Sequence, residues 1–555
     1  MIIDGKLLLP EGIEENFRFL ALEVTKQVEG MLAALASGDR EAITKIGMKD
    51  DYIDNLKAAI ENKCFNAVQK AAGMEKHELT MIRAVNTVSG NLERIADHTE
   101  SIASQMRYYD DTRFLHNYDY EEFFSIILEA LREVPAALLT REVTTALQIC
   151  RAEHHLDTLY KKNFDGIMGE LRSGHAPENL ITTVFVIRYL ERMGDCLLNI
   201  GEAIIFTAVG ERLKIHQFQA LEDNLALSGF DLNIPNLAFE GIWEGKSGCR
   251  IGHLSARNSG TEGESSQEVI FKEGNSRKIQ REKKAIEAWD KIMPGLPPRV
   301  FSFQNGGETA SILLEYLNGH NLQQIILSGD NALIKATLDA LFENLMKIWS
   351  LTKKDTPVKS AYLKQLFSRL NDVYAVHPYL REEPQKIGEI ETATLKSLLV
   401  KASPMEAELA SPYSVLIHGD FNIDNIIYSP AGKKIHFIDL HRSMDMDYVQ
   451  DVSTFIVSNF RVPVFESASR KMFNSIALAM RRFASEWAAT TGDATFERRL
   501  AFGLIRSFAT SSRFVFNRDF AKVMFHRSVY LLEKVTEHEG KEWDTFKIPD
   551  EILIY

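Results

Sequence analysis

Cysteine is scarce in this sequence, and its few copies are scattered. The only four in the 555 residues are Cys64, Cys150, Cys196 and Cys249, and no CxxC pair occurs. This argues against a disulfide framework and a zinc ribbon, and it favours a reduced compartment. No run of 18 apolar residues occurs, and no basic start precedes an apolar run. We therefore expect a cytoplasmic protein without a signal peptide or a transmembrane segment.

Positive charge is also in deficit. Lys and Arg total 64 against 77 Asp and Glu, which gives a net charge of −13. A surface of this sign argues against broad binding of nucleic acid or anionic membranes, so no nucleic-acid partner is expected. The chain is 45% hydrophobic and 25% charged, as globular proteins are, and its length suits two to four domains.

Proline is nearly absent from the first part of the chain. Between residues 11 and 210 the only prolines are Pro135 and Pro177, and apolar residues recur at helical spacing. This predicts six helices, at about 13–36, 39–72, 75–108, 119–137, 139–172 and 177–210. Later the pattern changes to short strands, at 237–243, 250–255, 268–272, 300–303 and 312–316. The predicted fold class is multidomain: a duplicated all-α three-helix bundle, then an α+β bilobal domain.

The helical half contains an internal repeat. The segment 92–103, LERIADHTESIA, aligns with the segment 190–201, LERMGDCLLNIG. Each repeat carries two acidic pairs at i,i+4 spacing: Asp50/Asp54 and Glu93/Asp97 in the first, Glu153/Asp157 and Glu191/Asp195 in the second. Such pairs repel by about 0.2–0.5 kcal/mol each unless something neutralises them. They are either ligands of bound metal or solvated and inter-helix acidic faces.

These motifs resemble those of the PhoU family, regulators of phosphate uptake and signalling. The resemblance covers about residues 10–210 and includes the duplicated bundle. It implies iron or zinc clusters held by the four acidic pairs, and a phosphate-transport or signalling protein as partner. It places a helical domain at 1–215, with repeats at about 10–110 and 118–210, followed by a linker at 216–236. Either this half regulates the half that follows, as we expect, or the fusion only tethers the two.

The most specific motif is residues 418–425, HGDFNIDN. It is followed by a short strand that ends at Asp439. Phosphoryl transfer needs one carboxylate near the acceptor hydroxyl, and an Asn and an Asp oxygen that hold magnesium on the phosphates. The spacing therefore predicts a phosphotransferase centre.

This half, residues 237–555, resembles the aminoglycoside phosphotransferase and choline kinase-like family. The resemblance assigns the catalytic base to Asp420 and the Mg²⁺ ligands to Asn425 and Asp439. It also implies that Lys272 contacts the phosphates of ATP and that Glu282 holds Lys272 in place. Arg442, Asp447 and Asp451 stand where that family supports the catalytic loop.

Further residues are implied for the nucleotide. The phosphate-covering turn is expected at Gly245 and Gly248, although its spacing is not that of a Walker A motif. The hinge that meets the adenine is expected at Glu315, Tyr316 and Leu317.

The sequence does not identify the acceptor. Five arginines would favour an anionic acceptor if they were not simply surface charges: Arg461, Arg481, Arg482, Arg506 and Arg513. The leading hypothesis is an ATP- and Mg²⁺-dependent kinase acting on a small-molecule hydroxyl, fused to a PhoU-like regulatory or metal-binding module. The alternative is a phosphate-signalling adaptor whose kinase fold binds nucleotide without significant turnover. A protein kinase is disfavoured because no APE-like segment follows Asp439. The oligomeric state stays open, a dimer included.

Overall fold

The computed structural model describes most of the chain. The residues outside the description are 1, 4–5, 8, 10–11, 48–49, 71–73, 75, 175, 211–212, 229–236, 242–248, 257–267, 382–385, 388 and 392. The chain divides into two compact units, residues 1–271 and 272–555. Among the described residues, no helix is both long and apolar enough to cross a membrane.

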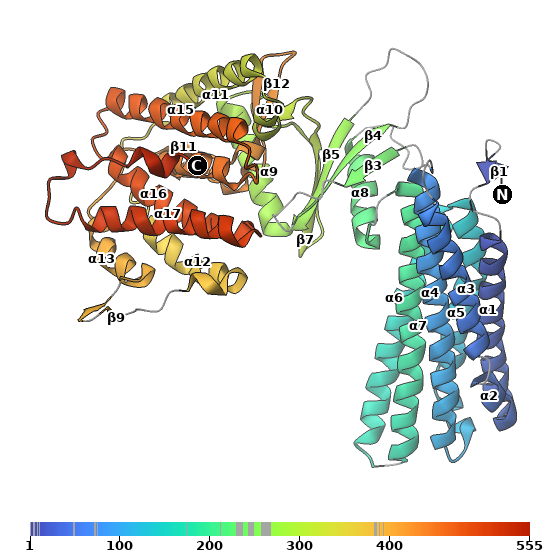
Figure 1. Ribbon diagram of the computed structural model, residues 1–555. Helices are drawn as coiled ribbons and strands as arrows, with labels where there is room; N and C mark the ends of the chain where they lie inside the picture. Colours follow the sequence, from blue (N-terminus) through green and yellow to red (C-terminus); the bar gives the residue numbers. More distant parts are fainter. Residues whose placement is uncertain are drawn as a thin grey trace. The chain divides into compact units, whose positions relative to one another are not determined.

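The first unit is mainly helical (Figure 1). Its helices are α1 (Ile13–Ser37), α2 (Arg40–Gly47), α3 (Asp50–Gln69), α4 (Lys76–Gln105), α5 (Tyr120–Thr140), α6 (Val143–Leu171), α7 (Pro177–Val209) and α8 (Ile215–Ser228). Its strands are β1 (Ile2–Ile3), β2 (Lys6–Leu7), β3 (Leu237–Gly241), β4 (Arg250–Ala256) and the start of β5 (Glu268–Asn275). Short 3-10 turns, η1 (Met106–Tyr108) and η2 (Thr112–Asn117), join α4 to α5.

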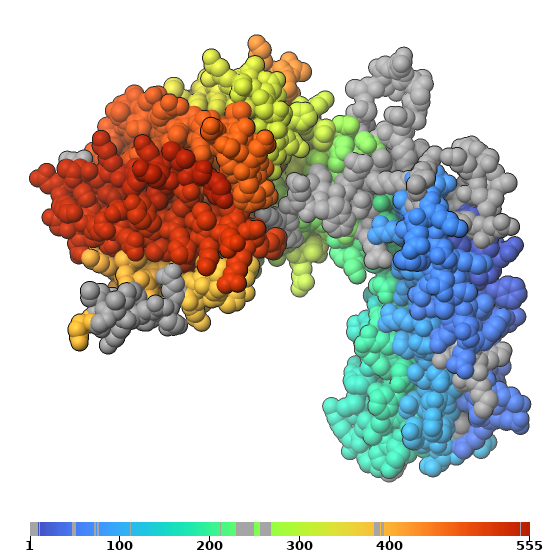
Figure 2. Space-filling model, viewed as in Figure 1, coloured from blue at the N-terminus to red at the C-terminus, as the bar shows by residue number. Residues whose placement is uncertain are grey.

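Two three-helix groups make up an elongated bundle, whose surface is seen in Figure 2. In the first group α1 packs against α3 and α4, and in the second α6 packs against α5 and α7. The long contact between α4 and α7 joins the groups, so the two copies of the repeated motif lie on packed helices. Pro177 stands at the start of α7, where its missing N–H costs nothing, and Gly210 ends the helix in the left-handed region.

The predicted helices agree with this bundle, with one correction. The single helix expected at 39–72 is two helices, α2 and α3, with residues 48–49 outside the description. The segment contains Gly47, and glycine lowers helical stability by about 1 kcal/mol relative to alanine. That cost favours an interruption at this point of the chain.

The segment expected as a linker, 216–236, is helical in its first part. Helix α8 covers Ile215–Ser228, and residues 229–236 lie outside the description. The strands β3 and β4 form an antiparallel hairpin, and β3 contacts α7. Arg250 Nη1 on β4 donates to Gln217 Oε1 on α8 at 2.6 Å. The first unit thus continues past the predicted boundary at residue 237 and includes this hairpin.

The second unit contains the remaining strands and helices. Its helices are α9 (Ser276–Ile292), α10 (Leu322–Ser328), α11 (Asn331–Thr352), α12 (Tyr362–Val376), α13 (Leu395–Ala407), α14 (Val449–Arg461), α15 (Ser467–Thr491), α16 (Phe496–Ser511) and α17 (Arg518–Thr536). Its strands are β6 (Val300–Asn305), β7 (Thr309–Glu315), β8 (His320–Asn321), β9 (Lys386–Ile387), β10 (Ile390–Glu391), β11 (Val415–Ile417), β12 (Ile426–Ser429), β13 (Lys434–Phe437) and β14 (Met444–Met446). Within this unit β6 pairs antiparallel with β7, with Phe303 opposite Ile312.

Short strand pairs in the second unit position the predicted motif. β12 pairs antiparallel with β13, with Ile426 opposite Phe437, and β11 pairs with β14. The segment HGDFNIDN runs from the end of β11 to the start of β12, and Asp439 follows β13. Helix α14 contacts the turn Ile423–Asn425 of this segment, α16 packs on α14, and α17 packs on α16. The observed architecture, a helical PhoU-like region followed by a kinase-like mixed sheet and helical region, confirms the predicted fold class.

Close packing in the bundle gives a test of this fold. A Cβ on Gly201 of α7 would lie 2.3 Å from Cys150 Sγ and 2.7 Å from the Ala146 carbonyl oxygen on α6. We expect Gly201→Ala to lower the free energy of unfolding of the helical unit by about 1–3 kcal/mol. The measurement is chemical denaturation followed by circular dichroism.

Gly90→Ala on α4 is the matched control, because a Cβ there meets no atom within 4 Å. The control is expected to be neutral or to gain about 0.5–1 kcal/mol from helix propensity. Equal effects of the two substitutions would contradict the packing of α6 on α7.

Candidate active site

A buried lysine stands between two carboxylates in the second unit. Lys272 Nζ on β5 donates to Glu282 Oε1 on α9 at 2.7 Å, and to Asp439 Oδ1 at 2.7 Å. Lys272 and Glu282 are 4% and 1% exposed. Burial alone would lower the pKa of Lys272, but the charges of Glu282 and Asp439 hold it above its ordinary value. The predicted pairing of Lys272 with Glu282 therefore exists in the structure, with Asp439 as a second partner.

Asp439 has a strained backbone and a charged side chain. Its φ of 62° lies in the left-handed region, which is uncommon for a residue other than glycine. Although burial would raise its pKa, the bonds from His441 and Lys272 hold it well below its usual range. His441 Nδ1 lies 3.2 Å from Asp439 Oδ1. The carboxylate is therefore ionised, as a cation ligand must be.

The loop before Asp420 is held by one buried carboxylate. The backbone N–H of His418 donates to Asp451 Oδ2 at 2.7 Å, and that of Gly419 donates to Asp451 Oδ1 at 2.9 Å. Gly419 has a φ of 82°, and a Cβ there would lie 2.3 Å from the carbonyl oxygen of Arg442. Helix α14 thus fixes the loop, and only glycine fits at its bend.

The side chain of His418 joins the loop to the segment that ends β13. Its Nδ1 accepts from the Asp420 N–H at 3.3 Å, and its Nε2 lies 2.9 Å from the carbonyl oxygen of Ile438. Nε2 must therefore carry the proton, which defines a neutral imidazole. Burial lowers the pKa of His418, in agreement with this neutral form. Its role is structural, since both ring nitrogens are bonded within the protein.

Asp420 and Asn425 lie in one hydrogen-bonded loop. Asn425 Nδ2 donates to the Asp420 carbonyl oxygen at 2.9 Å, and the Ile438 N–H donates to the Asn425 carbonyl oxygen at 3.1 Å. These bonds place Asn425 beside the segment that carries Asp439. The Asp420 carboxylate accepts from Asn422 Nδ2 at 2.9 Å and lies 3.2 Å from Arg442 Nη1.

The predicted hinge follows β7. The Glu315 N–H donates to the Arg299 carbonyl oxygen at 2.9 Å, and its carboxylate accepts from the Arg299 N–H at 3.0 Å. The N–H and the carboxylate of Glu315 thus both bond to the backbone of Arg299. Residues 316–317 follow and lead toward β8. Gly319, which ends this segment, packs against the Tyr428 carbonyl oxygen, 2.4 Å from where its Cβ would be. The predicted glycines Gly245 and Gly248 lie outside the described residues.

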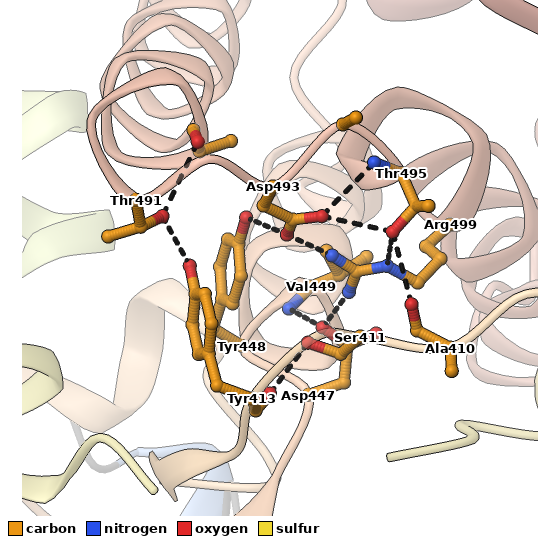
Figure 3. Close-up of polar contacts among 12 residues, drawn as sticks. Ala410, Ser411, Tyr413, Asp447, Tyr448, Val449, Thr491, Asp493, Thr495 and Arg499 are labelled. Carbon is orange, nitrogen blue, oxygen red and sulfur yellow. Dashed lines mark hydrogen bonds and ion pairs between the residues drawn. The ribbon is translucent and has the colours of Figure 1, made fainter. Parts of the chain in front are cut away.

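A buried ionic cluster supports the start of α14. Figure 3 shows the guanidinium of Arg499 between the carboxylates of Asp447 and Asp493, to which it donates. The Tyr448 hydroxyl donates to Asp493 Oδ2 at 2.7 Å, and the Val449 N–H donates to Asp447 Oδ1 at 3.1 Å. The two carboxylates raise the pKa of Arg499, although burial alone would lower it. The cluster therefore fixes the turn that leads to Asp451.

In the helical unit, the acidic pairs of the first repeat converge. Carboxylate oxygens of Asp54 on α3 and of Glu93 and Asp97 on α4 lie within 4.8 Å of one another. Such a set of hard oxygen donors suits a metal ion. The backbone of Asp50 starts α3, but its side chain lies outside the description.

Acidic residues of the second repeat form ion pairs with bases on their own helices. Glu191 lies 2.9 Å from Arg188, Asp195 lies 2.8 Å from Arg192, and Asp157 lies 2.6 Å from Lys161. Burial, with the charges of Asp157 and Asp195, raises the pKa of Glu153. Among the described residues, a three-carboxylate group occurs in the first repeat and not in the second.

Comparison with known proteins gives a separate result for each half. A model of the PhoU domain matches residues 17–106 and 120–204, and a model of the phosphotransferase enzyme family matches residues 254–486. The chain joins a PhoU-like half to a phosphotransferase-like half. This confirms the two resemblances drawn from the sequence motifs.

Individual proteins are similar to one part of the chain or the other. A phosphate-specific transport system accessory protein PhoU homolog from Borreliella burgdorferi is 29% identical over 202 residues, covering 35% of this chain and 89% of that protein. The homolog from Clostridium acetobutylicum is 25% identical over 195 residues, covering 34% and 88%. A crystal structure of an aminoglycoside-3'-phosphotransferase of type VIII aligns with 53% of this chain and 98% of its own, at 16% identity and a TM-score of 0.35.

The structure also identifies residues that the sequence did not single out. His441 bonds to Asp439 and Asn422 bonds to Asp420, and both lie within two residues of a predicted site residue. Their position so close to Asp439 and Asp420 in the sequence could have indicated that they contact these residues. Arg499 and Asp493 had no such signal, because they lie far along the chain from Asp447 and from the phosphotransferase motif.

The clamp on the loop should make stability depend on pH. Burial raises the pKa of Asp451 to about 7, although the two backbone N–H groups lower it. In the unfolded chain the value is about 3.9, so folding favours the protonated form. The stabilising contribution is full below about pH 4 and is lost as the pH rises through 7. We expect the melting temperature of the parent to fall, relative to that of Asp451→Asn, by several degrees between pH 4 and 7.

Asp445→Asn is the control for this titration. Asp445 is exposed and pairs with Lys354, so its variant should follow the pH profile of the parent. Parallel melting profiles of the parent and Asp451→Asn across this range would show that Asp451 is not the titrating group.

Proposed function

We propose that the phosphotransferase-like half transfers the γ-phosphoryl group of ATP to a hydroxyl of a small molecule, with Mg²⁺. The observation that carries the proposal is the bonding of Lys272 to both Glu282 and Asp439. Burying an ammonium and two carboxylates is costly, and groups perturbed in this way cluster at functional sites. This cluster lies beside the loop of Asp420.

The residues present fit a magnesium–nucleotide complex. Asp439 is ionised, and Asn425 donates its amide N–H to Asp420, which leaves its amide oxygen as the ligand atom. These two oxygens are the proposed Mg²⁺ ligands. A bound Mg²⁺ would neutralise charge on the phosphates during transfer. Lys272 would contact the phosphates, and the backbone of residues 315–317 would meet the adenine.

In the proposed step, the acceptor hydroxyl oxygen forms a bond to the γ-phosphorus. The bond from that phosphorus to the bridging oxygen breaks, and ADP leaves with the bonding electron pair. The Asp420 carboxylate takes the hydroxyl proton. In the structure Asp420 is held by Asn422 and Arg442, which fixes the direction of its oxygens.

One observation favours the adaptor alternative. Both oxygens of Asp420 have protein partners, so an acceptor hydroxyl would have to displace Arg442 or share the carboxylate with it. A kinase fold that binds nucleotide without turnover would retain this arrangement. Turnover measurements on Asp420 variants separate the two functions.

We expect Asp420→Asn to lower kcat by about 10²–10⁴-fold while leaving the affinity for Mg·ATP nearly unchanged, because the base acts on the acceptor. Asp439→Asn should instead weaken Mg·ATP binding. The measurements are ADP release and calorimetric titration with a non-hydrolysable ATP analogue.

Asp424→Asn is the matched control for these variants, since it removes the same charge from an exposed position of the same loop. Its kinetics should equal those of the parent. Parent-like turnover by both Asp420→Asn and Asp439→Asn would refute the site, whereas tight nucleotide binding with no turnover by the parent would establish the adaptor.

We propose that the PhoU-like half is a regulatory module that binds a metal such as iron or zinc through the first-repeat carboxylates. A bound cation would relieve repulsion among Asp54, Glu93 and Asp97. Regulation is supported by the first unit itself, in which α7 contacts β3 and α8 bonds to β4. A phosphate-transport or signalling protein is the proposed partner of this half.

We expect Zn²⁺ or Fe²⁺ to raise the melting temperature of the full-length protein, and Glu93→Gln with Asp97→Asn to remove most of that rise. The matched control is Glu191→Gln with Asp195→Asn, in the repeat whose carboxylates pair with arginines. The control should retain the response. Equal responses of the parent and the first-repeat variant would contradict metal binding there.

A further inference from the structure

Arginines from separate elements surround Asp420. Arg442, in the short turn after Asp439, lies 3.2 Å from the Asp420 carboxylate. Arg369 on α12 is half-buried, and its charge acts on those of Arg442 and Asp420. Arg506 on α16 also lies within range of Asp420 and of Arg369. Helix α12 packs directly on α16, so these arginines share one region of the second unit.

Arg506 is an unusual member of this group, because it is buried. Its side chain is 7% exposed, and its Nη2 has a long bond of 3.4 Å to Ser453 Oγ. The guanidinium lies 5.6 Å from the centre of the Tyr362 ring. Its buried Nε has no hydrogen-bond partner among the described residues. Arg506 therefore keeps unused donor capacity beside the catalytic loop.

The carboxylates that act on these arginines also have other partners. Asp451 accepts from the backbone N–H groups of His418 and Gly419, and Asp372 pairs with Arg513. The charge of Asp420 acts on Arg369, Arg442 and Arg506 alike. Burial, followed by neighbouring arginine charges, lowers the pKa of Arg369, and burial lowers that of Arg506 to about 10. Burying a cation is costly, and a bound anion would offset part of that cost.

The other arginines that the sequence suggested have different surroundings. Arg481 bonds to Glu497 and Asp550, and Arg482 is an exposed residue of α15. Arg461 lies over the Phe514 ring. Arg513 pairs with Asp372 at 2.9 Å, and the charges of both act on Arg369. Burial next to Asp420 thus distinguishes Arg506 from this set.

We propose that the acceptor of this phosphotransferase is an anionic alcohol, whose phosphate or carboxylate group is bound by Arg369, Arg442 and Arg506. The inference rests on the proposed function, since it places the acceptor hydroxyl at Asp420. Guanidinium groups suit both anions because they offer paired N–H donors. An anion that draws Arg442 to itself would also free one oxygen of Asp420 for the hydroxyl proton.

Binding is tested first, with inorganic phosphate as the probe. The full-length protein is saturated with Mg²⁺ and a non-hydrolysable ATP analogue, so that the nucleotide occupies its own site. Calorimetric titration with phosphate is then compared between the parent, Arg369→Gln and Arg506→Gln. We expect each variant to weaken phosphate binding about tenfold or more, while Arg482→Gln equals the parent.

Turnover is tested second, with acceptors that differ mainly in charge. Glycerol, glycerate, glycerol 3-phosphate and choline are compared by ADP release at saturating ATP. We expect the two anionic alcohols to be preferred, and their ratio shows whether the site takes carboxylate or phosphate. Arg369→Gln should lower kcat/KM for the preferred anion about tenfold to a hundredfold, with the KM for ATP unchanged.

The outcomes separate the inference from the function on which it rests. Failure of the analogue to bind would remove the proposed function itself. Analogue binding together with phosphate affinity that is equal in the parent and in both arginine variants would overturn the anionic site. Faster turnover of glycerol or choline than of either anion would do the same. Arg369 is half-buried, so its variant keeps the test valid if Arg506→Gln does not fold.

Discussion

The ammonium of Lys272 is the interaction on which the second unit's site depends. Burying such a charge costs several kcal/mol, and Glu282 and Asp439 offset that cost only while both stay in place. The three groups come from β5, from α9 and from the segment after β13. One buried charge therefore fixes two distant parts of the unit relative to a strand.

A second, separate constraint fixes the loop that carries Asp420. Asp451 binds two consecutive backbone N–H groups, and the Arg499 cluster fixes the turn at which its helix begins. Buried charged groups in the helical region of the second unit thus fix the backbone of the loop that carries Asp420. Substitutions in α16 would act on Asp420 through this chain of contacts.

The sequence predicted what depends on local spacing. The motif at 418–425 lies between two strands and Lys272 bonds to Glu282, because strand–turn–strand segments impose short-range order. The strand expected to end at Asp439 ends earlier, at Phe437. The Arg499 cluster was beyond such reasoning. Arg499 and Asp447 are 52 residues apart, and only the tertiary fold brings them together.

The repeat of the helical half shows a similar limit. The motif predicted four equivalent acidic pairs, yet the second repeat carries its own bases. By the alignment of the two motifs, Gly90 stands in the first repeat where Arg188 stands in the second. That difference was visible in the sequence, but its meaning required the 2.9 Å contact of Arg188 with Glu191.

Helix α9 carries one more feature with a practical consequence. Trp289 is buried on this helix, donates its indole N–H to Ser443 Oγ at 2.9 Å and meets the Phe437 ring edge-on at 5.8 Å. Both partners flank Asp439, and α9 also carries Glu282. The fluorescence emission of an indole responds to the polarity of its surroundings and to its hydrogen bonding. If the other four of the five tryptophans were replaced by phenylalanine, Trp289 would report optically how α9 sits against the segment of Asp439.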